Sequence, residues 1–549
     1  MQEWIVTLHN REDLPGFYDD METEGGNLFI PNRAVEVAHK RPISRNTHYM
    51  LTREEVDLIK SDDRVWDVTF AEFAEMVKPN GWVMDNEKFS KDWNTDESDH
   101  NWGLLRHSEA TNRNNWGSNA TTNITSDLTS TASGKNVDVV IVDGHIDPVH
   151  PEFAVNEDGT GGTRINQFNW FSLTNAVTGG SNGTYMYSRS GSYLNAADVA
   201  DNNHGCHCAG TVAGNSQGWA RDANIYNISP YGSNPNSLPS SLLWDYVREW
   251  HNTKAINPAT GRRNPTITNN SYGSIVEAGD GNWGKITRIT YRGTNFNPGR
   301  DLTQAELQAR GCYAPLASGQ MTLPLYDTSR QADHDDAIAD GIIIVASAGN
   351  DSWKITEQGD QDYNNDFDIT FGGNPYTLKL HRGSLSGAYY APIINVGAQS
   401  NDLNEDKANF SNCGSQIDIY AAGEGIQSSL HSGGTPDTRN SAYELGKYQG
   451  TSMAGPQVAG VLAILAESRP NMTQAEAHAW IINNANVDQM ADTDADDPMD
   501  RNSLQGSANR MLRWINQRAI SGNSFPQKNF SDRPTTGTLY PRARIRRRG

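Results

Sequence analysis

The chain has 549 residues, of which 66 are acidic and 45 basic, giving a formal net charge of −21. A net acidic surface repels phosphate, so the composition argues against nucleic acid as a partner. Because 36% of the residues are hydrophobic and four are cysteines, we expect a folded protein with many polar loops and no disulfide framework. No apolar run is long enough for a membrane span, so we expect no membrane partner.

The two ends of the chain differ from its middle. Residues 1–95 predict a small α+β unit with a polar linker: a strand at 4–8, a helix begun by a capping box at Thr52, and a strand at 65–70. Residues 516–549 are polar with an arginine-rich end, which favours a solvated tail over a docking signal. The start lacks the pattern of a secretory signal, so we expect synthesis in the cytoplasm, with release, particle association and oligomeric state left open.

Residues 100–515 carry the pattern of a mainly parallel α/β sheet. Short apolar runs, typical of strands buried on both faces, recur at 137–142, 223–229, 266–269, 342–346 and 393–396. Helical patterns lie between several of these runs, and strands that alternate with helices predict an α/β fold. Residues 275–328 fit neither pattern well, and we expect a long insertion there.

Three motifs supply the side chains that acyl transfer by a serine requires. A serine hydroxyl is a weak nucleophile, so it needs a base, a carboxylate that orients the base, and donors for the oxyanion. Asp143 follows the first buried strand, where parallel sheets place functional groups, and His204 begins a segment of small residues that predicts a closely packed helix. Ser452 opens another helix, whose free amides favour negative charge and whose first turn tolerates Pro456.

Together these motifs resemble the signatures of the subtilase family of serine proteases. Val139–Asp143, His204–Thr211 and Gly450–Pro456 resemble its Asp, His and Ser segments, in the chain order of that family. Ala346–Asn350 resembles its oxyanion segment, and Asn269–Gly273 resembles the strand that pairs with substrate. Several motifs in order are far more specific than one motif alone.

The resemblance implies a three-layer sandwich and a serine endopeptidase whose chemistry requires no cofactor. Ser452 would be the nucleophile, and His204 the general base and acid. Asp143 would orient the imidazole, and Asn350 would form the oxyanion hole with the Ser452 amide. The polypeptide substrate would bind as an added strand. The residues expected to contact it are Ser271, Tyr272, Gly273, Ala346, Ser347, Ala348 and Gly349.

Residues 1–95 resemble the propeptide of the family, which implies a self-processed zymogen. This piece would assist folding, cover the cleft as the chain's own partner, and be cut within about 75–100. Gly144 and His145 follow Asp143 where the family has a hydroxyl residue and then glycine, so a usual hydrogen bond to the carboxylate is missing. Cys208 resembles a cysteine that proteinase K-like members place near their histidine, and we expect it to be buried and inert.

Two metal hypotheses compete with simpler explanations. Zinc at His204, Cys206, His207 and Cys208 would leave the other motifs as coincidence, and residue 206 does not share a helical face with the rest, so we expect His207 to be structural. Acidic residues at alternate positions suit structural calcium, although solvated loops explain them equally well. The weak calcium candidates are Asp360, Asp362, Asp492, Asp494 and Asp496.

A second function competes with the protease. The insertion, the absence of a secretion signal and the basic tail also suit an assembly protein, such as one of a virus particle, built on a subtilase scaffold with weak or no activity. An intact chain found in a purified assembly would favour this alternative.

Overall fold

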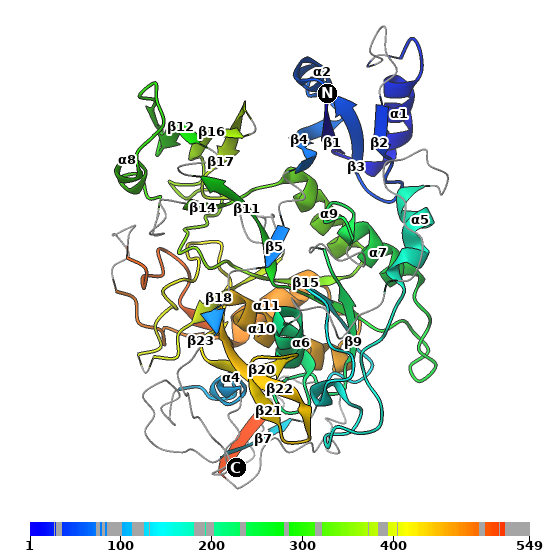
Figure 1. The fold of residues 1–549 in the computed structure, drawn as a ribbon, viewed down its shortest axis with the longest axis vertical. Coiled ribbons are helices and arrows are strands. Elements are labelled where there is room, and N and C mark those ends of the chain that lie inside the picture. The colour runs from blue at the N-terminus through cyan, green and yellow to red at the C-terminus, as the bar shows by residue number, and fades with distance from the viewer. Residues whose placement is uncertain are drawn as a thin grey trace.

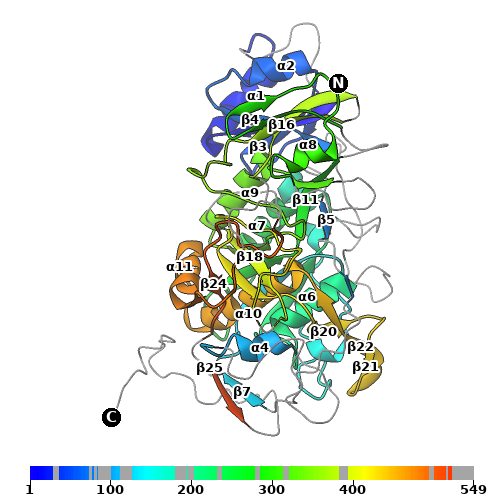
Figure 2. The same cartoon turned by 90° about the vertical axis from the view of Figure 1, so that its left-hand side faces the viewer.

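A computed structural model gives the architecture of the chain (Figure 1). The molecule is elongated, with α1 and α2 near one end of the long axis and β7 and β25 near the other (Figure 2). The structure describes residues 1–26, 28, 36–72, 77–79, 83–84, 101–111, 126–130, 132–179, 193, 203–230, 238–278, 285–312, 321–371, 373–382, 393–402, 404–493, 500–514 and 517–521. No helix among these residues is long and apolar enough to cross a membrane.

A central sheet of eight strands has the order β23-β24-β19-β18-β15-β10-β8-β9. β23 pairs antiparallel with β24, and the other neighbouring pairs are parallel. The strands are β8 (Asp138–Val142), β9 (Asn224–Ile228), β10 (Thr266–Asn270), β15 (Ile343–Ser347), β18 (Ile394–Gln399), β19 (Ile419–Ala422), β23 (Asn486–Val487) and β24 (Arg510–Met511). Each of the five apolar runs is one of these strands, which confirms the predicted parallel α/β class.

Helices cover both faces of this sheet, because its strands are apolar on both sides. Val139 and Ile141 of β8 belong to one apolar cluster, whereas Val140 and Val142 belong to another. The first cluster includes residues of α6 (Asn203–Ala213), α10 (Thr451–Ser468) and α11 (Gln474–Asn484). The second includes residues of α7 (Leu243–Thr253) and α9 (Thr328–Ala339). The result is the expected three-layer sandwich.

A separate antiparallel sheet forms at the N-terminal end, in the order β2-β3-β1-β4. Its elements are β1 (Gln2–Leu8), α1 (Leu14–Glu22), β2 (Glu36–His39), β3 (Asn46–Leu51), α2 (Arg53–Ile59) and β4 (Val65–Phe70). Phe17 of α1 and Ile59 of α2 pack with Trp4 and Val6 of β1 in one apolar cluster. The predicted capping box at Thr52 is present.

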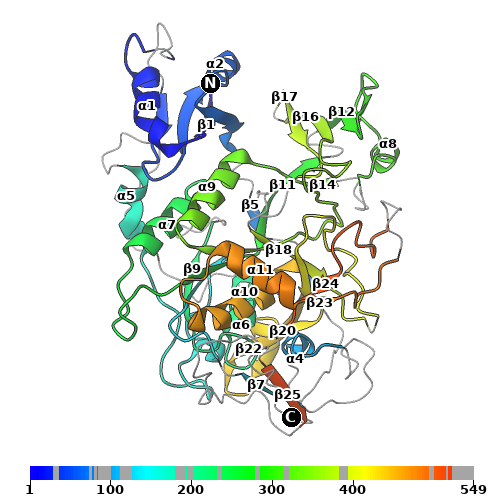
Figure 3. The ribbon, with the colours of Figure 1, turned by 180° about the vertical axis from the view of Figure 1, so that it is seen from behind.

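The N-terminal sheet lies next to α9 (Figures 1 and 3). Arg41 follows β2 and is fully buried; its guanidinium contacts Asp245 of α7 and Asp333 of α9, each at 2.7 Å. Asn46 Nδ2 donates to Asp333 Oδ1 at 2.9 Å and to the Ser329 carbonyl at 3.0 Å. Buried polar contacts therefore attach this sheet to the helices that cover the central sheet.

Smaller sheets surround the core, in the orders β14-β11-β5, β13-β12-β16-β17, β20-β22-β21 with β6 on β22, and β25-β7. Their strands are β5 (Val77–Pro79), β6 (Val83–Met84), β7 (Ser126–Ser130), β11 (Tyr272–Ala278), β12 (Lys285–Tyr291), β13 (Thr294–Phe296), β14 (Met321–Pro324), β16 (Asp366–Phe371), β17 (Asn374–Lys379), β20 (Ile426–Leu430), β21 (Thr435–Asp437), β22 (Asn440–Gln449) and β25 (Gln517–Ser521). The short helices are η1 (Arg11–Asp13), α4 (Trp102–Arg106), η2 (Pro151–Phe153), η3 (Trp170–Leu173), α5 (Thr174–Thr178) and α8 (Gln304–Gln308).

The stretch 275–328 contains regular structure that the sequence pattern did not predict. It carries most of β11 and all of β12, β13, α8 and β14. β12 alternates buried and partly exposed residues imperfectly, and β13 is largely exposed, so neither gives a clear period of two. β12 pairs with β16, which lies outside this stretch.

Candidate active site

Asp143 and His204 are in contact at the carboxyl ends of the parallel strands. Asp143 directly follows β8, and its two carboxylate oxygens lie 2.8 and 2.9 Å from His204 Nδ1. Both side chains are buried, with 0% and 2% of their surface exposed. Because a carboxylate only accepts, this contact places the imidazole proton on Nδ1 and directs Nε2 elsewhere as a base.

The backbone around Asp143 explains how α6 approaches so closely. A Cβ atom on Gly205 would lie 2.3 Å from the Gly144 carbonyl oxygen, so glycine lets the first turn of α6 contact the loop after β8. Asn227 Nδ2 donates to the carbonyls of Asp143 and Gly144, which fixes the end of β8. The Gly144 amide itself donates to Asp143 Oδ1 at 2.7 Å. A backbone donor thus contacts the carboxylate although the family's usual hydroxyl is missing.

Ser452 lies in the first turn of α10, and its carbonyl has an unusual environment. Pro456 has no N–H, so it cannot make the helical hydrogen bond to the Ser452 carbonyl. That oxygen instead accepts from Cys208 Sγ and from Ser271 Oγ, each at 3.3 Å. The prediction that Pro456 occupies the first helical turn was wrong, because α10 begins at Thr451 and Pro456 is in its second turn.

Cys208 links the helix that carries His204 to the helix that carries Ser452. Its sulfur lies 4.0 Å from His204 Nδ1 and donates to the Ser452 carbonyl. Burial, and then the nearby Asp143 carboxylate, raises the pKa of the thiol well above its usual value, so the group stays protonated. Ser452 Oγ is buried and has no hydrogen-bond partner among the described residues. Buried hydroxyl groups usually make a hydrogen bond, and catalytic hydrogen bonds often form only when the substrate is bound.

The carboxamide of Asn350 is oriented by the residue before Ser452. Asn350 Oδ1 accepts from the Thr451 amide at 2.9 Å and from Thr451 Oγ1 at 2.7 Å. Its Nδ2 lies beside Gly450, where a Cβ atom would be 3.3 Å away. Asn412 holds the loop from the other side, since its Nδ2 donates to the Ala348 carbonyl at 2.8 Å and its Oδ1 accepts from the Trp353 amide. These roles of Thr451 and Asn412 were not inferred from the sequence, although Thr451 lies in the Gly450–Pro456 motif.

The strand predicted to bind substrate is paired with a segment of the same chain. β11 runs antiparallel to β5, with Tyr272 opposite Pro79 and Gly273 opposite Lys78. β6 then pairs with β22, with Val83 opposite Gln449, three residues before Ser452. β5 therefore lies beside the predicted substrate strand, and β6 lies beside the strand that leads into the nucleophile.

The other predicted substrate residues are buried. Ser271 contacts the Ser452 carbonyl, and the Tyr272 side chain lies in the apolar cluster with α7 and α9. Ala346, Ser347 and Ala348 at the end of β15 have 0% of their surface exposed, and Gly349 follows them with a positive φ of 114°. Gly349 donates its amide to Thr451 Oγ1 at 3.1 Å. These residues shape the backbone next to Asn350.

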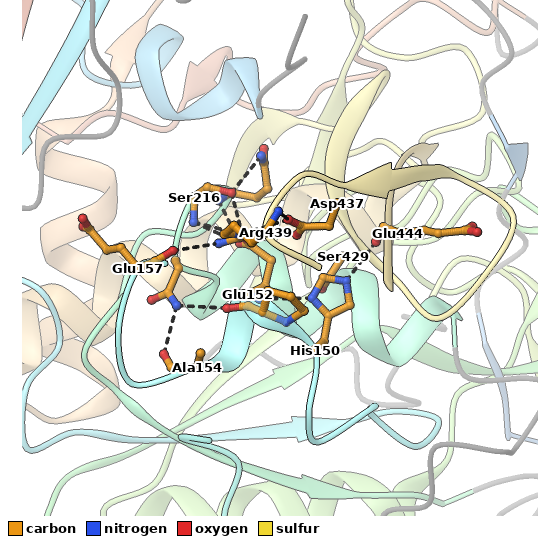
Figure 4. Close-up of polar contacts among 12 residues, drawn as sticks. His150, Glu152, Ala154, Glu157, Ser216, Ser429, Asp437, Arg439 and Glu444 are labelled. Atoms are coloured by element: carbon orange, nitrogen blue, oxygen red, sulfur yellow. Dashed lines mark hydrogen bonds and ion pairs between the residues drawn. The ribbon is translucent and has the colours of Figure 1, made fainter. Parts of the chain in front are cut away.

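A buried carboxylate ties together the three segments that carry the triad residues (Figure 4). Glu152 lies in η2, which follows Asp143 in the chain, and is fully buried. It accepts from the amides of Ser216 and Gln217, which follow α6, each at 3.0 Å to Oε2. It also contacts the guanidinium of Arg439, in the turn between β21 and β22. Although burial opposes the charge, Arg439 and the other donors lower the pKa of Glu152 to about 2.

The structure does not bring together the four residues of the zinc hypothesis, His204, Cys206, His207 and Cys208. Cys206 Sγ accepts from the Asp147 amide at 3.0 Å, and His207 Nε2 donates to the Ile426 carbonyl at 2.7 Å. Burial lowers the pKa of His207 to about 3, so this ring is a neutral structural donor stacked on Tyr448. Cys208 approaches His204 and Asp143 instead.

The calcium candidates that the structure describes already contact other protein groups. Asp362 contacts Arg292 at 2.6 Å and Lys354 at 2.8 Å, and Asp360 contacts Lys354 at 3.4 Å, so calcium there would compete with these cations. Asp492 Oδ1 accepts from Ser503 Oγ and from the Leu504 amide. The predicted ligands Asp494 and Asp496 lie outside the described residues.

The sequence of the chain is similar to sequences of known proteins. The model of the Subtilase family matches residues 134–510. Subtilisin of Bacillus pumilus is 33% identical over 153 residues, which is 28% of this chain and 42% of that protein. Subtilisin-like protease 8 of Trichophyton verrucosum is 24% identical over 310 residues, which is 55% of this chain and 46% of that protein. The matches thus span less than half the length of either relative.

Two solved structures align with a larger share of the chain. Fervidolysin from Fervidobacterium pennivorans, a keratinolytic enzyme related to subtilisin, aligns over 92% of this chain and 60% of its own, with a TM-score of 0.46 and 16% identity. A cold adapted subtilisin-like serine proteinase aligns over 76% of this chain and 98% of its own, with a TM-score of 0.42 and 18% identity.

Proposed function

The chain belongs to the subtilase family, and we propose that it is a serine endopeptidase that uses Ser452, His204 and Asp143. The observation that carries the proposal is the buried contact between Asp143 and His204 Nδ1, on a helix that Cys208 joins to the Ser452 carbonyl. A buried carboxylate, an imidazole and a hydroxyl at a helix start are the groups that acyl transfer requires.

The residues would act in two chemical steps. His204 Nε2 takes the proton of Ser452 Oγ, which attacks the peptide carbonyl, and Asp143 stabilises the imidazolium. Asn350 Nδ2 and the Ser452 amide donate to the oxyanion, and His204 then protonates the leaving amine. Water, activated by His204, hydrolyses the acyl-enzyme and regenerates the hydroxyl. Thr451 contributes by fixing Asn350 Oδ1.

Self-processing of a zymogen is supported by the pairing of residues 77–79 with β11 and of residues 83–84 with β22. A substrate would bind in the same way: its first part would pair antiparallel with β11, as β5 does. The part after the cleaved bond would lie beside β22, as β6 does. The four peptide bonds between Pro79 and Val83 would then pass the nucleophile. We therefore place the cut in this stretch, within the interval expected from the sequence.

N-terminal sequencing of purified protein tests processing and activity together. We expect a new N-terminus between residues 80 and 83 in the parent chain, and an intact chain in the Ser452→Ala and His204→Ala variants. The processed protein should hydrolyse denatured casein, whereas both variants should not. Processing at the same bond in the Ser452→Ala variant would contradict the proposal. An uncut parent chain held in a purified particle, with no casein hydrolysis, would favour the assembly alternative.

A further inference from the structure

Three metal-binding side chains meet on the N-terminal sheet, apart from the triad. Glu3 Oε1 of β1 lies 2.8 Å from His48 Nδ1 of β3 and 3.8 Å from His39 Nε2 of β2. One ligand atom from each residue lies within 4.8 Å of the other two. The sheet register explains the cluster, because His39 pairs directly with His48, and Glu3 lies two residues from Ile5, the partner of His48 on β1. Residues two apart on a strand share one face.

The cluster is largely protected from water. His48 is fully buried and His39 is 8% exposed, while the Glu3 side chain keeps 28% of its surface. A carboxylate oxygen and two imidazole nitrogens that face one another are donors that a single cation can share. The partly exposed Glu3 side chain gives such a cation a route from solvent.

We propose that Glu3, His39 and His48 bind one divalent transition-metal ion, for which Zn²⁺ is the best fit. Two imidazoles and a carboxylate are donors that Zn²⁺ accepts in tetrahedral sites, and three protein ligands leave the fourth position to water. Ligand atoms about 2.0–2.2 Å from such an ion lie roughly 3.3–3.5 Å from one another. The 2.8 Å and 3.8 Å contacts bracket that value, so small side-chain rotations would complete the site.

The position of the cluster suggests what the ion would do. His39 lies two residues before Arg41, and His48 lies two residues after Asn46, on the strands that carry these contacts to α9. An ion shared by β1, β2 and β3 would hold Arg41 and Asn46 in the register that meets Asp333. Metal binding would therefore stabilise the docked N-terminal unit by mass action, independently of any catalytic activity.

The test must separate this site from the cluster of Asp143, His204 and Cys208, which also gathers metal-binding atoms. Full-length Ser452→Ala protein, which keeps the N-terminal unit attached, is stripped with a chelator and titrated with Co²⁺ while its visible spectrum is recorded. We expect one equivalent to produce the spectrum of a four-coordinate nitrogen and oxygen site, without the sulfur-to-cobalt band that Cys208 would give. Zn²⁺ should displace this cobalt and raise the melting temperature.

Paired variants assign the ligands. His39→Ala, on the outer strand, and Glu3→Gln should each weaken Co²⁺ binding about a hundredfold or more and abolish the Zn²⁺-dependent rise in melting temperature. His204→Ala should retain the signal, as should His9→Ala, which removes an exposed histidine of the same unit. The metal-free melting temperature of each variant checks its folding. No stoichiometric binding by the parent, unchanged binding in both ligand variants, or a sulfur band lost with His204→Ala would overturn the proposal.

Discussion

Glu152→Gln should make the protein less stable at neutral pH and reduce the loss of stability in acid. The substitution keeps the side-chain shape but removes the negative charge from a fully buried site that faces Arg439 and Ser216 (Figure 4). The Gln217 amide also donates to this carboxylate. A decrease of the pKa from 4.5 to about 2 corresponds to about 3 kcal/mol of native-state stabilisation at pH 7. Because the folded pKa lies below the unfolded value, this contribution is present above pH 4.5 and is lost as the pH falls towards 2.

The assay is urea unfolding followed by tryptophan fluorescence, in the Ser452→Ala background so that the chain stays intact. At pH 7 the Gln variant should lose about 3 kcal/mol of unfolding free energy, and at pH 3 roughly half of that difference should remain. Glu157→Gln is the matched control, since this neighbouring side chain is exposed and Arg439 contacts its backbone carbonyl. Equal losses at pH 7 and pH 3, or an equal effect of the control, would refute the assigned role of the buried charge.

Three further substitutions test the site and the docking contacts. Asn350→Ala should lower kcat on casein-derived peptides by about a hundred- to a thousandfold with little change in KM, the range measured when such a donor is removed from a subtilisin; a kcat within threefold of the parent would exclude the oxyanion role. Gly205→Ala should abolish processing, because its Cβ would lie 2.3 Å from the Gly144 carbonyl, and unimpaired processing would show that the α6 contact is dispensable. Arg41→Met, made in the Ser452→Ala chain, should cost about 3–5 kcal/mol because Asp245 and Asp333 stay buried without their cation; limited trypsin digestion should then release residues 1–70 faster, and unchanged protection would contradict this.

The sequence predicted the parallel sheet because its strands are apolar on both faces. That signal also placed Asp143 at a strand end, and a segment of small residues placed His204 at a helix start. Their contact was expected from the resemblance to the subtilase family, not from these local patterns. The substrate segment Ser271–Gly273 was named by resemblance, but its pairing with Val77–Pro79 could not be predicted, because strand partners far apart in sequence leave no local pattern.

Other parts of the site depend on contacts that no periodicity reports. Glu152 gave no sign of its role, since its donors come from a loop after α6 and from a turn at Arg439, nearly three hundred residues away. The missing N–H of Pro456 was visible in the sequence. Its consequence is that the Ser452 carbonyl accepts from Cys208 and Ser271 instead. This could not be predicted without knowing where the helix begins. The pair His39 and His48 likewise became a cluster only through the register of the N-terminal strands.

The most direct test of the central claim is the site of labelling by a fluorophosphonate, which reacts with an activated serine. Processed parent protein is treated with the reagent, digested and analysed by mass spectrometry. The account predicts a single adduct, located on Ser452. An adduct on another serine, or no adduct on a folded and processed chain, would contradict the assignment of Ser452 as the nucleophile.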